Sequence, residues 1–230
     1  MGIPKGLWGR VIKTLEDLVP HYDRGNKALS LLQDWRFRIK GLSFISKSEC
    51  FRILDLGGGP GTLEYYLAKR CKHVIYLDAS FYMTLYAKKI YGISTRIDFI
   101  NAVFEALPFR SEVFDYIITS FAIRDSLNMV KALDETSRVC KGKFIMVEVG
   151  KPDNTFIRLM FSIYLKVIVP FLTALATGII RRNPWRLIYH TYLYLPENST
   201  LKMILSRFFR KVEVYSYLLG AVIIALAEKT

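Results

Sequence analysis

The sequence predicts a doubly wound α/β fold, in which helices cover both faces of a mostly parallel β-sheet. Short, nearly continuous apolar segments have the length of buried strands, and they lie at residues 52–56, 73–77, 95–100, 114–120 and 143–149. Segments of helical length separate these strands, at residues 62–70, 80–91 and 127–140. A glycine-rich turn directly follows the first expected strand. This alternation predicts a ligand site beyond the carboxyl ends of the strands.

Composition limits the class of protein. The 230 residues suffice for one domain, and 52% hydrophobic with 23% charged residues indicates a globular chain rather than a disordered one. The net charge of +13 favours anionic partners, which are nucleic acid, acidic lipid or a phosphorylated substrate. The charge does not select among these three. A single glutamine beside abundant Lys, Arg and Ile is typical of thermophile proteins.

The cysteines predict neither a cross-link nor a metal site. Cys50, Cys71 and Cys140 are odd in number and show no paired spacing, which argues against a disulfide framework and a zinc site. The first residues, M-G-I-P-K-G-L-W-G-R, lack the apolar core of a signal peptide. We therefore expect a reducing compartment, the cytoplasm.

The chain is expected to form one domain, residues 1–230, with four segments. These segments are a helical cap at 1–45, an α/β core at 46–151, an apolar helical insertion or lid at 152–196, and a C-terminal helix with a β-hairpin at 197–230. In the cap, Pro20 interrupts a first helix, and a second helix is expected over residues 27–40. The closing hairpin joins β-rich runs at 211–218 and 221–227 and adds an antiparallel strand to the sheet.

The glycine-rich turn lies in I-L-D-L-G-G-G-P-G, residues 53–61. The dinucleotide fingerprint requires glycine at its first, third and sixth positions, and Thr62 occupies the sixth position counted from Gly57. A G-x-G-x-G pattern does fit, because glycine permits positive φ and leaves room for a ligand against the backbone. Acids end the first two strands at Asp55 and Asp78, and an acid at the second strand end can accept both hydroxyls of a ribose.

Together these features resemble the class I S-adenosylmethionine-dependent methyltransferases, whose first motif is similar to L-D-L-G-G-G-P-G-T-L. Further stretches are similar to the ubiquinone/menaquinone-biosynthesis C-methyltransferases: Y-D-R-G-N-K-A-L-S-L, E-A-L-P-F-R-S-E-V-F-D-Y-I-I-T-S-F, A-I-R-D and E-V-G-K-P-D-N. The resemblance implies a Rossmann-like seven-stranded sheet with the last strand antiparallel. It also implies S-adenosylmethionine as cofactor, S-adenosylhomocysteine as product, and no metal.

The resemblance implies roles for matching residues. Asp78 holds the cofactor ribose, and Asp55 lies near the methionine ammonium group. The remaining cofactor contacts come from the turn, the adenine site, the fourth strand and the cap: Gly57, Gly59, Gly61, Ala79, Val103, Phe104, Ser120, Tyr22 and Asn26. Val103 departs from the family, which has Asp-Ala or Asn-Ala beside the adenine, and Pro60 replaces a usual threonine.

The leading hypothesis is C-methylation of a prenylated quinol-type ring or another lipophilic small molecule. Arg124 is expected to stabilise the oxyanion that develops on the acceptor, with Asp125 and Tyr22 as partners. His190 is an outside candidate for a general base. Two alternatives stay open: an RNA or protein methyltransferase, which the net charge permits, and a non-catalytic S-adenosylmethionine-binding module. The absence of a recognisable RNA-binding module predicts no nucleic-acid partner.

The insertion is apolar enough that it could span or contact a membrane. Residues 159–180 are nearly long enough to span a bilayer, although Lys166 lies inside the segment and Pro170 breaks it. A spanning helix would separate the fifth strand from the hairpin of the same sheet. The alternatives are a buried cap or homodimer interface, and a lid resting on the anionic inner face of the cell membrane. The second alternative uses the basic and aromatic residues Arg158, Lys166, Arg181, Arg182, Arg186, Trp185, Tyr189, Tyr192 and Tyr194.

Overall fold

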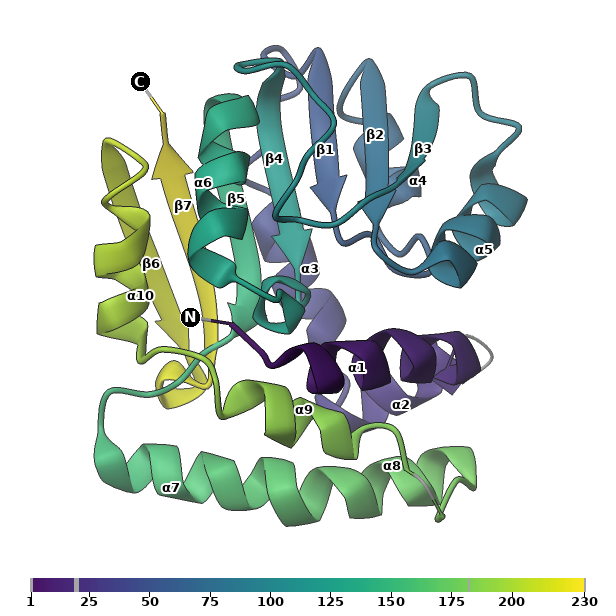
Figure 1. The fold of residues 1–230 in the computed structure, drawn as a ribbon, viewed down its shortest axis with the longest axis vertical. Coiled ribbons are helices and arrows are strands. Elements are labelled where there is room, and N and C mark those ends of the chain that lie inside the picture. The colour runs from purple at the N-terminus through teal and green to yellow at the C-terminus, as the bar shows by residue number, and fades with distance from the viewer. Residues whose placement is uncertain (1, 19–20, 182, 230) are drawn as a thin grey trace.

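A seven-stranded sheet organises the molecule, which we describe from a computed structural model covering residues 2–18, 21–181 and 183–229. Pro20 and Arg182 lie outside these described residues. The strand order is β3-β2-β1-β4-β5-β7-β6, and β7 alone runs antiparallel to its neighbours. The strands are β1 Arg52–Leu56, β2 His73–Asp78, β3 Ile97–Asn101, β4 Phe114–Ser120, β5 Cys140–Val149, β6 Lys211–Tyr217 and β7 Val222–Glu228. The predicted sheet is thus confirmed (Figure 1).

Helices cover both faces of the sheet because neighbouring strand residues alternate between two cores. Leu54 and Ile117 belong to one hydrophobic cluster, and Ile53 and Ile118 belong to the other. The helices α6 Met129–Val139 and α10 Asn198–Leu205 lie in front of the sheet in Figure 1, and α4 Glu64–Ala68 lies behind it. The remaining core helix is α5 Phe81–Tyr91. The doubly wound prediction is therefore confirmed.

The N-terminal cap contains three helices, and here the predicted 27–40 helix is wrong. The helices are α1 Lys5–Leu18, α2 Tyr22–Leu29 and α3 Asp34–Leu42. The Tyr164 hydroxyl donates to the Leu29 carbonyl at 2.6 Å, so this carbonyl has a tertiary partner where α2 ends. The next residues turn the chain, with Leu31 and Leu32 in left-handed backbone conformations. A long-range contact that the sequence pattern does not reveal accompanies the break.

A disulfide joins Cys50 and Cys71, which contradicts the expectation that no cysteines pair. Each cysteine lies two residues before a strand, and parallel pairing sets Arg52 opposite His73. The register therefore brings the two cysteines together at the amino ends of β1 and β2, although 21 positions separate them in sequence. The argument for a reducing compartment loses its basis. Cys140 is free and buried at the start of β5.

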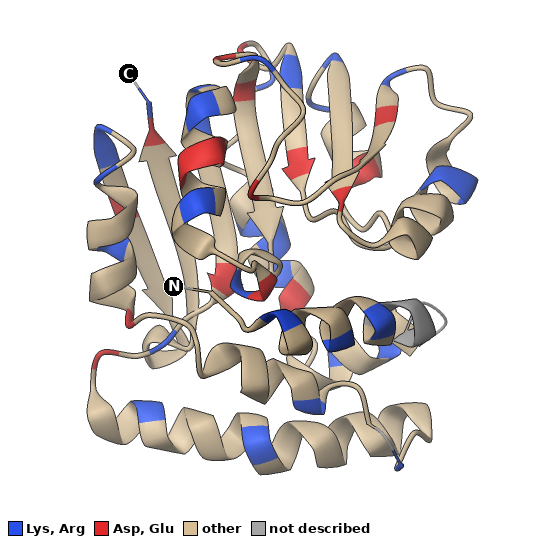
Figure 2. Ribbon diagram, in the orientation of Figure 1, with Lys and Arg blue, Asp and Glu red and all other residues tan. Residues whose placement is uncertain are grey.

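The insertion forms one long helix with most of one face in solvent. The helices α7 Thr155–Ile163 and α8 Val169–Thr177 are joined by a π-turn at Tyr164–Ile168, and α9 Arg186–Tyr192 follows. Pro170 does not break the helix, because it lies in the first turn of α8, directly after the π-turn. Figure 1 shows the helix along one edge of the molecule, and in Figure 2 its only charged residues are basic.

This long helix is apolar on its exposed side as well as on its packed side. Phe156, Phe171 and Leu175 are 70%, 67% and 77% exposed, whereas Leu165 and Val169 are buried. The expectation of a buried cap is therefore wrong for the single chain. By length and composition, Thr155–Thr177 could cross a bilayer. One face nevertheless packs on the domain, and β7 after the insertion pairs with β5 before it.

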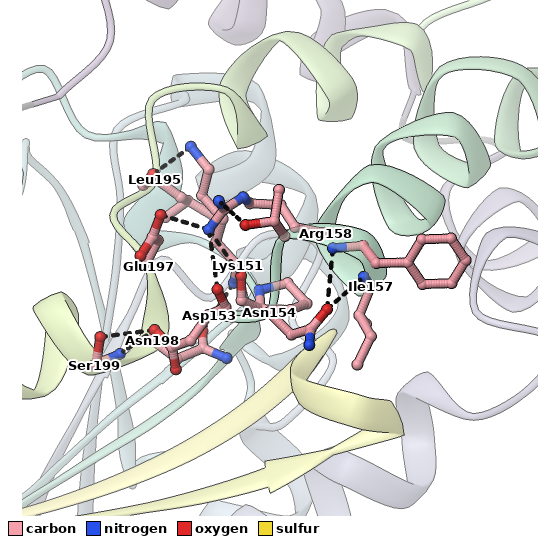
Figure 3. Close-up of polar contacts among 12 residues, drawn as sticks. Lys151, Asp153, Asn154, Ile157, Arg158, Leu195, Glu197, Asn198 and Ser199 are labelled. Carbon is pink, nitrogen blue, oxygen red and sulfur yellow. Dashed lines mark hydrogen bonds and ion pairs between the residues drawn. The ribbon is translucent and has the colours of Figure 1, made fainter.

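Polar contacts fix the two ends of the insertion to each other (Figure 3). Asp153 accepts hydrogen bonds from the backbone and hydroxyl of Ser199 at 3.0 and 2.7 Å. Arg158 forms an ion pair with Glu197, and both side chains point toward each other in Figure 3. Asn154 caps α7 by accepting from two backbone N–H groups. The long helix consequently starts from a fixed point at the end of β5.

Candidate functional site

Three cavities lie at the carboxyl ends of the strands, where the fold predicts a ligand. The first, of about 100 Å³, is lined by Gly57, Gly59 and Asp78 from the strand ends and by Val11 and Thr14 from α1. A second cavity of about 320 Å³ adjoins it and extends toward the insertion. A third cavity, of about 50 Å³, shares Asp78 with the first. The site thus has smaller parts at the glycine turn and a larger part that is more apolar.

The glycine turn fits a ligand that approaches the backbone closely. Gly57 and Gly59 have φ of +83° and +57°, in the left-handed region that favours glycine. A Cβ at Gly59 would point toward the Tyr22 hydroxyl, 3.7 Å away, and both residues line the first cavity. A side chain there would occupy the place expected for the methionine part of S-adenosylmethionine. These residues therefore fit the cofactor.

Asp78 lies at the end of β2 with both carboxylate oxygens directed by backbone groups. Gly59 N–H donates to Oδ2 at 2.9 Å, and Ser80 N–H donates to Oδ1 at 2.8 Å. Burial raises the pKa of Asp78 to about 6, although the two N–H groups act to lower it. Each oxygen keeps lone-pair capacity for a ribose hydroxyl. The position of Asp78 agrees with the role that the resemblance implies.

The third cavity brings together the residues expected near the adenine. Ala79, Val103 and Phe104 line it, together with Trp8 of α1 and the polar residues Glu105 and Ser126. The Val103 side chain cannot accept a hydrogen bond, so at this position it offers a ring apolar contact alone. The α1 helix therefore lines both cofactor cavities, and Figure 1 shows it across the carboxyl ends of the strands.

Two predicted cofactor residues do not line any of the three cavities: Asp55 and Gly61. Asp55 is buried beneath the turn, where it shares a hydrogen bond with Glu64. Burial raises the pKa of Asp55 to about 6, against the lowering effects of Glu64 and the Arg38 charge. Burial and the Asp55 charge raise the pKa of Glu64 well above its usual value. Two carboxyl groups this close share a proton, so Asp55 supports the turn from below.

Arg124 is the central charged group between the cavities. It follows β4 in a short 3₁₀ turn, Ile123–Asp125, and its Nη1 donates to Glu148 Oε1 at 2.8 Å. Asp125 Oδ2 lies 3.5 Å from Nη2. Burial lowers the pKa of the guanidinium, but the charges of Asp125 and Glu148 raise it above its usual value. Arg124 therefore stays a cation inside the site.

Glu148 is a residue of the site that the sequence analysis does not identify. It is fully buried in β5, and it accepts from both the side chain and the backbone N–H of Arg124. Burial raises its pKa, while the Arg124 charge lowers it. The signal was an acid inside the apolar strand segment F-I-M-V-E-V, since a buried carboxylate requires a partner. Glu148 fixes the orientation of Arg124.

The large cavity is apolar and shares one wall with the cofactor cavity. Its lining includes Leu29, Phe37, Phe161 and Leu165, from the cap and the insertion helix. Five residues line both cavities: Tyr22, Asn26, Phe121, Arg124 and Ile188. The predicted catalytic residues Arg124 and Tyr22 thus lie between the two spaces, and Asp125 lines only the cofactor side. An acceptor in the large cavity would present its reactive end to this wall.

Arg38 is a second buried arginine at the same wall, and no feature of the sequence singled it out. Its Nη1 donates to Ser120 Oγ at 2.9 Å, and its guanidinium lies 5.2 Å from the centre of the Phe121 ring. Ser120 lines the first cavity, as predicted, and Arg38 lines the second. Arg38 therefore links the strand end to the apolar cavity.

The outside candidate His190 is exposed on α9 and lines none of the three cavities. The structure therefore gives it no place as a base. Within residues 2–18, 21–181 and 183–229, no group of three or more His, Cys, Asp or Glu side chains could hold a metal ion. The charged chemistry of the site rests on Arg124 and its carboxylate partners.

Comparison with known proteins gives one matching family description. A model of the ubiE/COQ5 methyltransferase family matches residues 8–229. The demethylmenaquinone methyltransferase of Clavibacter sepedonicus is 30% identical over 172 residues, covering 74% of this chain and 70% of the relative. The demethylmenaquinone methyltransferase of Thermus thermophilus is 29% identical over 187 residues, covering 79% and 81%.

Solved structures share the fold at low identity. A chain from the complex between the Haloferax volcanii Trm112 methyltransferase activator and a methyltransferase aligns with a TM-score of 0.67 and 12% identity. That alignment covers 94% of this chain and 97% of the other. A SAM-dependent methyltransferase from Aquifex aeolicus aligns with a TM-score of 0.56 and 15% identity, covering 89% and 93%.

Proposed function

Because the chain belongs to the ubiE/COQ5 methyltransferase family, we propose that it methylates a ring carbon of a prenylated quinol-type acceptor or a similar lipophilic molecule. The chain is an S-adenosylmethionine-dependent methyltransferase of this family. The acceptor is the part that we propose. Curated relatives carry the name demethylmenaquinone methyltransferase, which agrees with a ring bearing a long apolar tail.

One observation carries the proposal: the cavity expected for the cofactor and a larger, more apolar cavity meet at a wall that contains Arg124 and Tyr22. A reactive ring at this wall would leave its tail among Leu29, Phe161 and Leu165. Burial of apolar surface contributes roughly 25 cal/mol per Å², so the cavity favours a tailed acceptor over a small polar one. The proposal therefore follows from where the two cavities touch.

S-adenosylmethionine, when bound, supplies an electrophilic methyl group. The chain orients the acceptor and stabilises the oxyanion that remains when a ring hydroxyl gives its proton to water, because this oxyanion makes the ring carbon nucleophilic. After methyl transfer the same ring carbon releases its hydrogen as a proton, which restores the aromatic ring. Arg124 stabilises this oxyanion as a buried cation held by Glu148. Tyr22 lies on the same wall and can contact the ring oxygen, and Asp125 orients Arg124 from the cofactor side. Water exclusion comes from α1 and the apolar lining.

The acceptor is tested by a panel of methyl-transfer reactions. Demethylated quinols with tails of increasing length, total RNA and a protein mixture are each incubated with labelled S-adenosylmethionine. We expect transfer to the quinols alone, with KM falling as the tail lengthens until the cavity is filled. Transfer to RNA or protein at physiological salt, with none to any quinol, would contradict the proposal.

The role of Arg124 is tested with a charge-balanced pair of substitutions. Arg124→Gln alone leaves Glu148 buried without its cation, so the matched variant is Arg124→Gln with Glu148→Gln. We expect kcat on a quinol to fall about 100-fold, as for loss of an oxyanion contact. Binding of S-adenosylhomocysteine, measured by calorimetry, should fall much less. Unchanged turnover in the double variant would exclude this role.

The same proposal places the chain in the cytoplasm, at the inner face of the cell membrane, because a prenylated acceptor resides in the bilayer. Two features support a membrane location: the exposed apolar face of Thr155–Thr177 and the two basic residues on that helix. A homodimer formed through the same face is the competing arrangement. Fractionation of cells and light scattering of the purified protein separate the two.

A further inference from the structure

Four leucines adopt a backbone conformation that leucine normally avoids. Leu31 and Leu32, between α2 and α3, have φ of 50° and 65°; Leu218 and Leu219, between β6 and β7, have φ of 49° and 58°. Glycine or asparagine is the usual residue in this left-handed region, because a Cβ there crowds the backbone. Strain of this kind persists only where the surrounding structure holds it. Glu112 and Phe121 have positive φ as single residues, whereas each leucine turn has it at two consecutive positions.

These leucines surround the opening of the large apolar cavity. Leu31 and Leu218 both line that cavity, yet they are 59% and 52% exposed, so they lie at its mouth. Their neighbours Leu32 and Leu219 are 73% and 77% exposed and line none of the three cavities. Each turn thus presents one leucine to the cavity mouth and one to the outside.

The exposed face of the long helix adjoins the same cavity. Phe161, Tyr164 and Leu165 of this helix line the cavity from one side. The outer side carries apolar residues at helical spacing: Phe156, Met160, Ile163, Val167, Phe171 and Leu175, between 44% and 77% exposed. An exposed apolar surface of this extent marks an interaction site.

Basic side chains accompany each apolar part. The backbone carbonyl of Lys27, whose side chain is exposed, accepts from Leu32 N–H at 2.8 Å. Lys40 Nζ lies 4.4 Å from the centre of the Tyr217 ring, directly before the second leucine turn. Lys166 is exposed on the helix. Apolar tips flanked by cations match the chemistry of an anionic bilayer, whose apolar layer lies beneath negative headgroups.

We propose that the two leucine turns insert into an anionic lipid bilayer and form the opening through which the acceptor's tail enters the large cavity. The helix Thr155–Thr177 then lies along the bilayer surface beside them. This inference rests on the proposed function, because only a tailed acceptor needs such an opening. It goes further in assigning the entry route to Leu31, Leu32, Leu218 and Leu219. The strained backbone is accounted for because it directs apolar side chains outward into lipid.

The outward leucines allow a test that separates binding from folding. In the variant Leu32→Asn with Leu219→Asn, asparagine tolerates the left-handed conformation better than leucine. We therefore expect a Tm equal to or above that of the parent. Affinity for vesicles of phosphatidylcholine with phosphatidylglycerol should fall at least about tenfold, because two exposed leucines no longer enter lipid. Co-sedimentation measures this affinity, and vesicles of phosphatidylcholine alone measure the contribution of charge.

A matched control removes two other exposed apolar residues. Ile93 is 96% exposed after α5, and Met203 is 61% exposed on α10; neither lines any of the three cavities. Ile93→Asn with Met203→Asn should bind vesicles like the parent. In the leucine variant, the ratio of turnover on a vesicle-borne quinol to turnover on a short-tailed soluble quinol should fall.

Three results would overturn the inference. The leucine variant could bind vesicles as tightly as the parent, or the control variant could lose binding equally. Light scattering could also show a parent dimer that the leucine variant dissociates, which would assign the turns to a second copy of the chain. Failure of the proposed function looks different: vesicle binding persists, and no quinol is methylated in either form.

Discussion

The carboxyl ends of the strands and the long insertion helix differ in the groups that they bury. The strand ends bury charged groups, whereas the insertion helix exposes apolar groups. At the strand ends, the charged groups are buried and have partners within the chain: backbone N–H groups donate to Asp78, and Arg124 forms an ion pair with Glu148. Along the insertion, apolar groups such as Phe156 and Leu175 are exposed and have no such partner among the described residues. The charges of the first region are paired within the chain, whereas the apolar side chains of the second region face solvent.

This difference separates the two halves of the reaction. The strand ends hold the cofactor and the cation that acts on the acceptor, and their geometry depends on internal hydrogen bonds. The insertion and the leucine turns provide access for an apolar molecule, and their chemistry depends on the environment. Substitutions at the strand ends should therefore leave vesicle binding intact, and substitutions in the insertion or the leucine turns should leave cofactor binding intact. The predictions below test this separation.

The largest effect on cofactor binding is expected at Asp78. Asp78→Asn removes the charge that organises the Gly59 and Ser80 N–H groups, so S-adenosylhomocysteine should bind about 100-fold more weakly, given roughly 1.5–3 kcal/mol per charged hydrogen bond. Calorimetry measures the change, and Asp98→Asn, on the exposed side of β3, is the control. Vesicle binding should be retained. Loss of both cofactor binding and vesicle binding in Asp78→Asn would show that the two regions are not independent.

Removal of the disulfide should destabilise the sheet and spare the insertion. Closing a loop of 21 residues contributes about 3 kcal/mol in the chain-entropy model. Cys50→Ser with Cys71→Ser should therefore lower the free energy of unfolding by about that amount. Urea denaturation measures the change, and the parent protein in the presence of a reductant serves as a parallel sample. The linked pair lies at the amino ends of the strands, away from the cofactor, so cofactor affinity should persist. A variant as stable as the parent would exclude a stabilising cross-link.

The pH dependence should have opposite signs for stability and for cofactor binding. Burial raises the pKa of both Asp55 and Asp78 to about 6 from 3.8, so the folded state binds protons that the unfolded state has lost between these values. This contribution to the free energy of unfolding is full below pH 3.8 and is lost as pH rises through about 6.

Cofactor binding requires ionised Asp78, so its affinity should rise over the same range. We expect S-adenosylhomocysteine to bind about fivefold more weakly at pH 5 than at pH 6, because the ionised fraction of a carboxyl group with a pKa of about 6 falls by that factor. Urea denaturation and calorimetry at matched pH values check the two signs. If stability and cofactor affinity both rose, or both fell, between pH 4 and pH 6, the role of Asp78 in binding the cofactor would be contradicted.

The smallest effects are expected at two helix caps, one in each region. Asn154 caps α7 of the insertion, and Asn128 caps α6 of the core. Alanine at either position should cost about 1 kcal/mol. Hydrogen exchange should report the loss locally in α7 for Asn154→Ala and across the sheet for Asn128→Ala. Equal, global effects would show that the insertion unfolds with the core.

The strand ends were predictable from sequence because their signals are local. An acid, three spaced glycines and a second acid follow directly from the strand pattern, and Gly57, Gly59 and Asp78 lie together in the structure as expected. Arg124 and Tyr22 were placed by family resemblance, and the structure puts both on one wall. The composition typical of a thermophile stays a prediction.

The other features depend on contacts between distant segments, which periodicity does not encode. The pairing of Cys50 with Cys71 needs the strand register, and the break at Leu31 is accompanied by a hydrogen bond from Tyr164. Arg38 is one of several charged residues in its helix, and only the fold directs it to Ser120. Asp55 was expected at the ligand and instead supports the turn with Glu64.

The central claim is that a cofactor cavity and a tail cavity meet at Arg124 so that a methyl group is transferred to a ring carbon. The most direct measurement incubates the protein with isotopically labelled S-adenosylmethionine and a tailed demethylated quinol, and locates the label in the product by nuclear magnetic resonance. We predict a labelled methyl group bonded to a ring carbon, at a rate that depends on Arg124. A label on a ring oxygen, or a quinol left unlabelled by an enzyme that binds S-adenosylhomocysteine, would contradict the account.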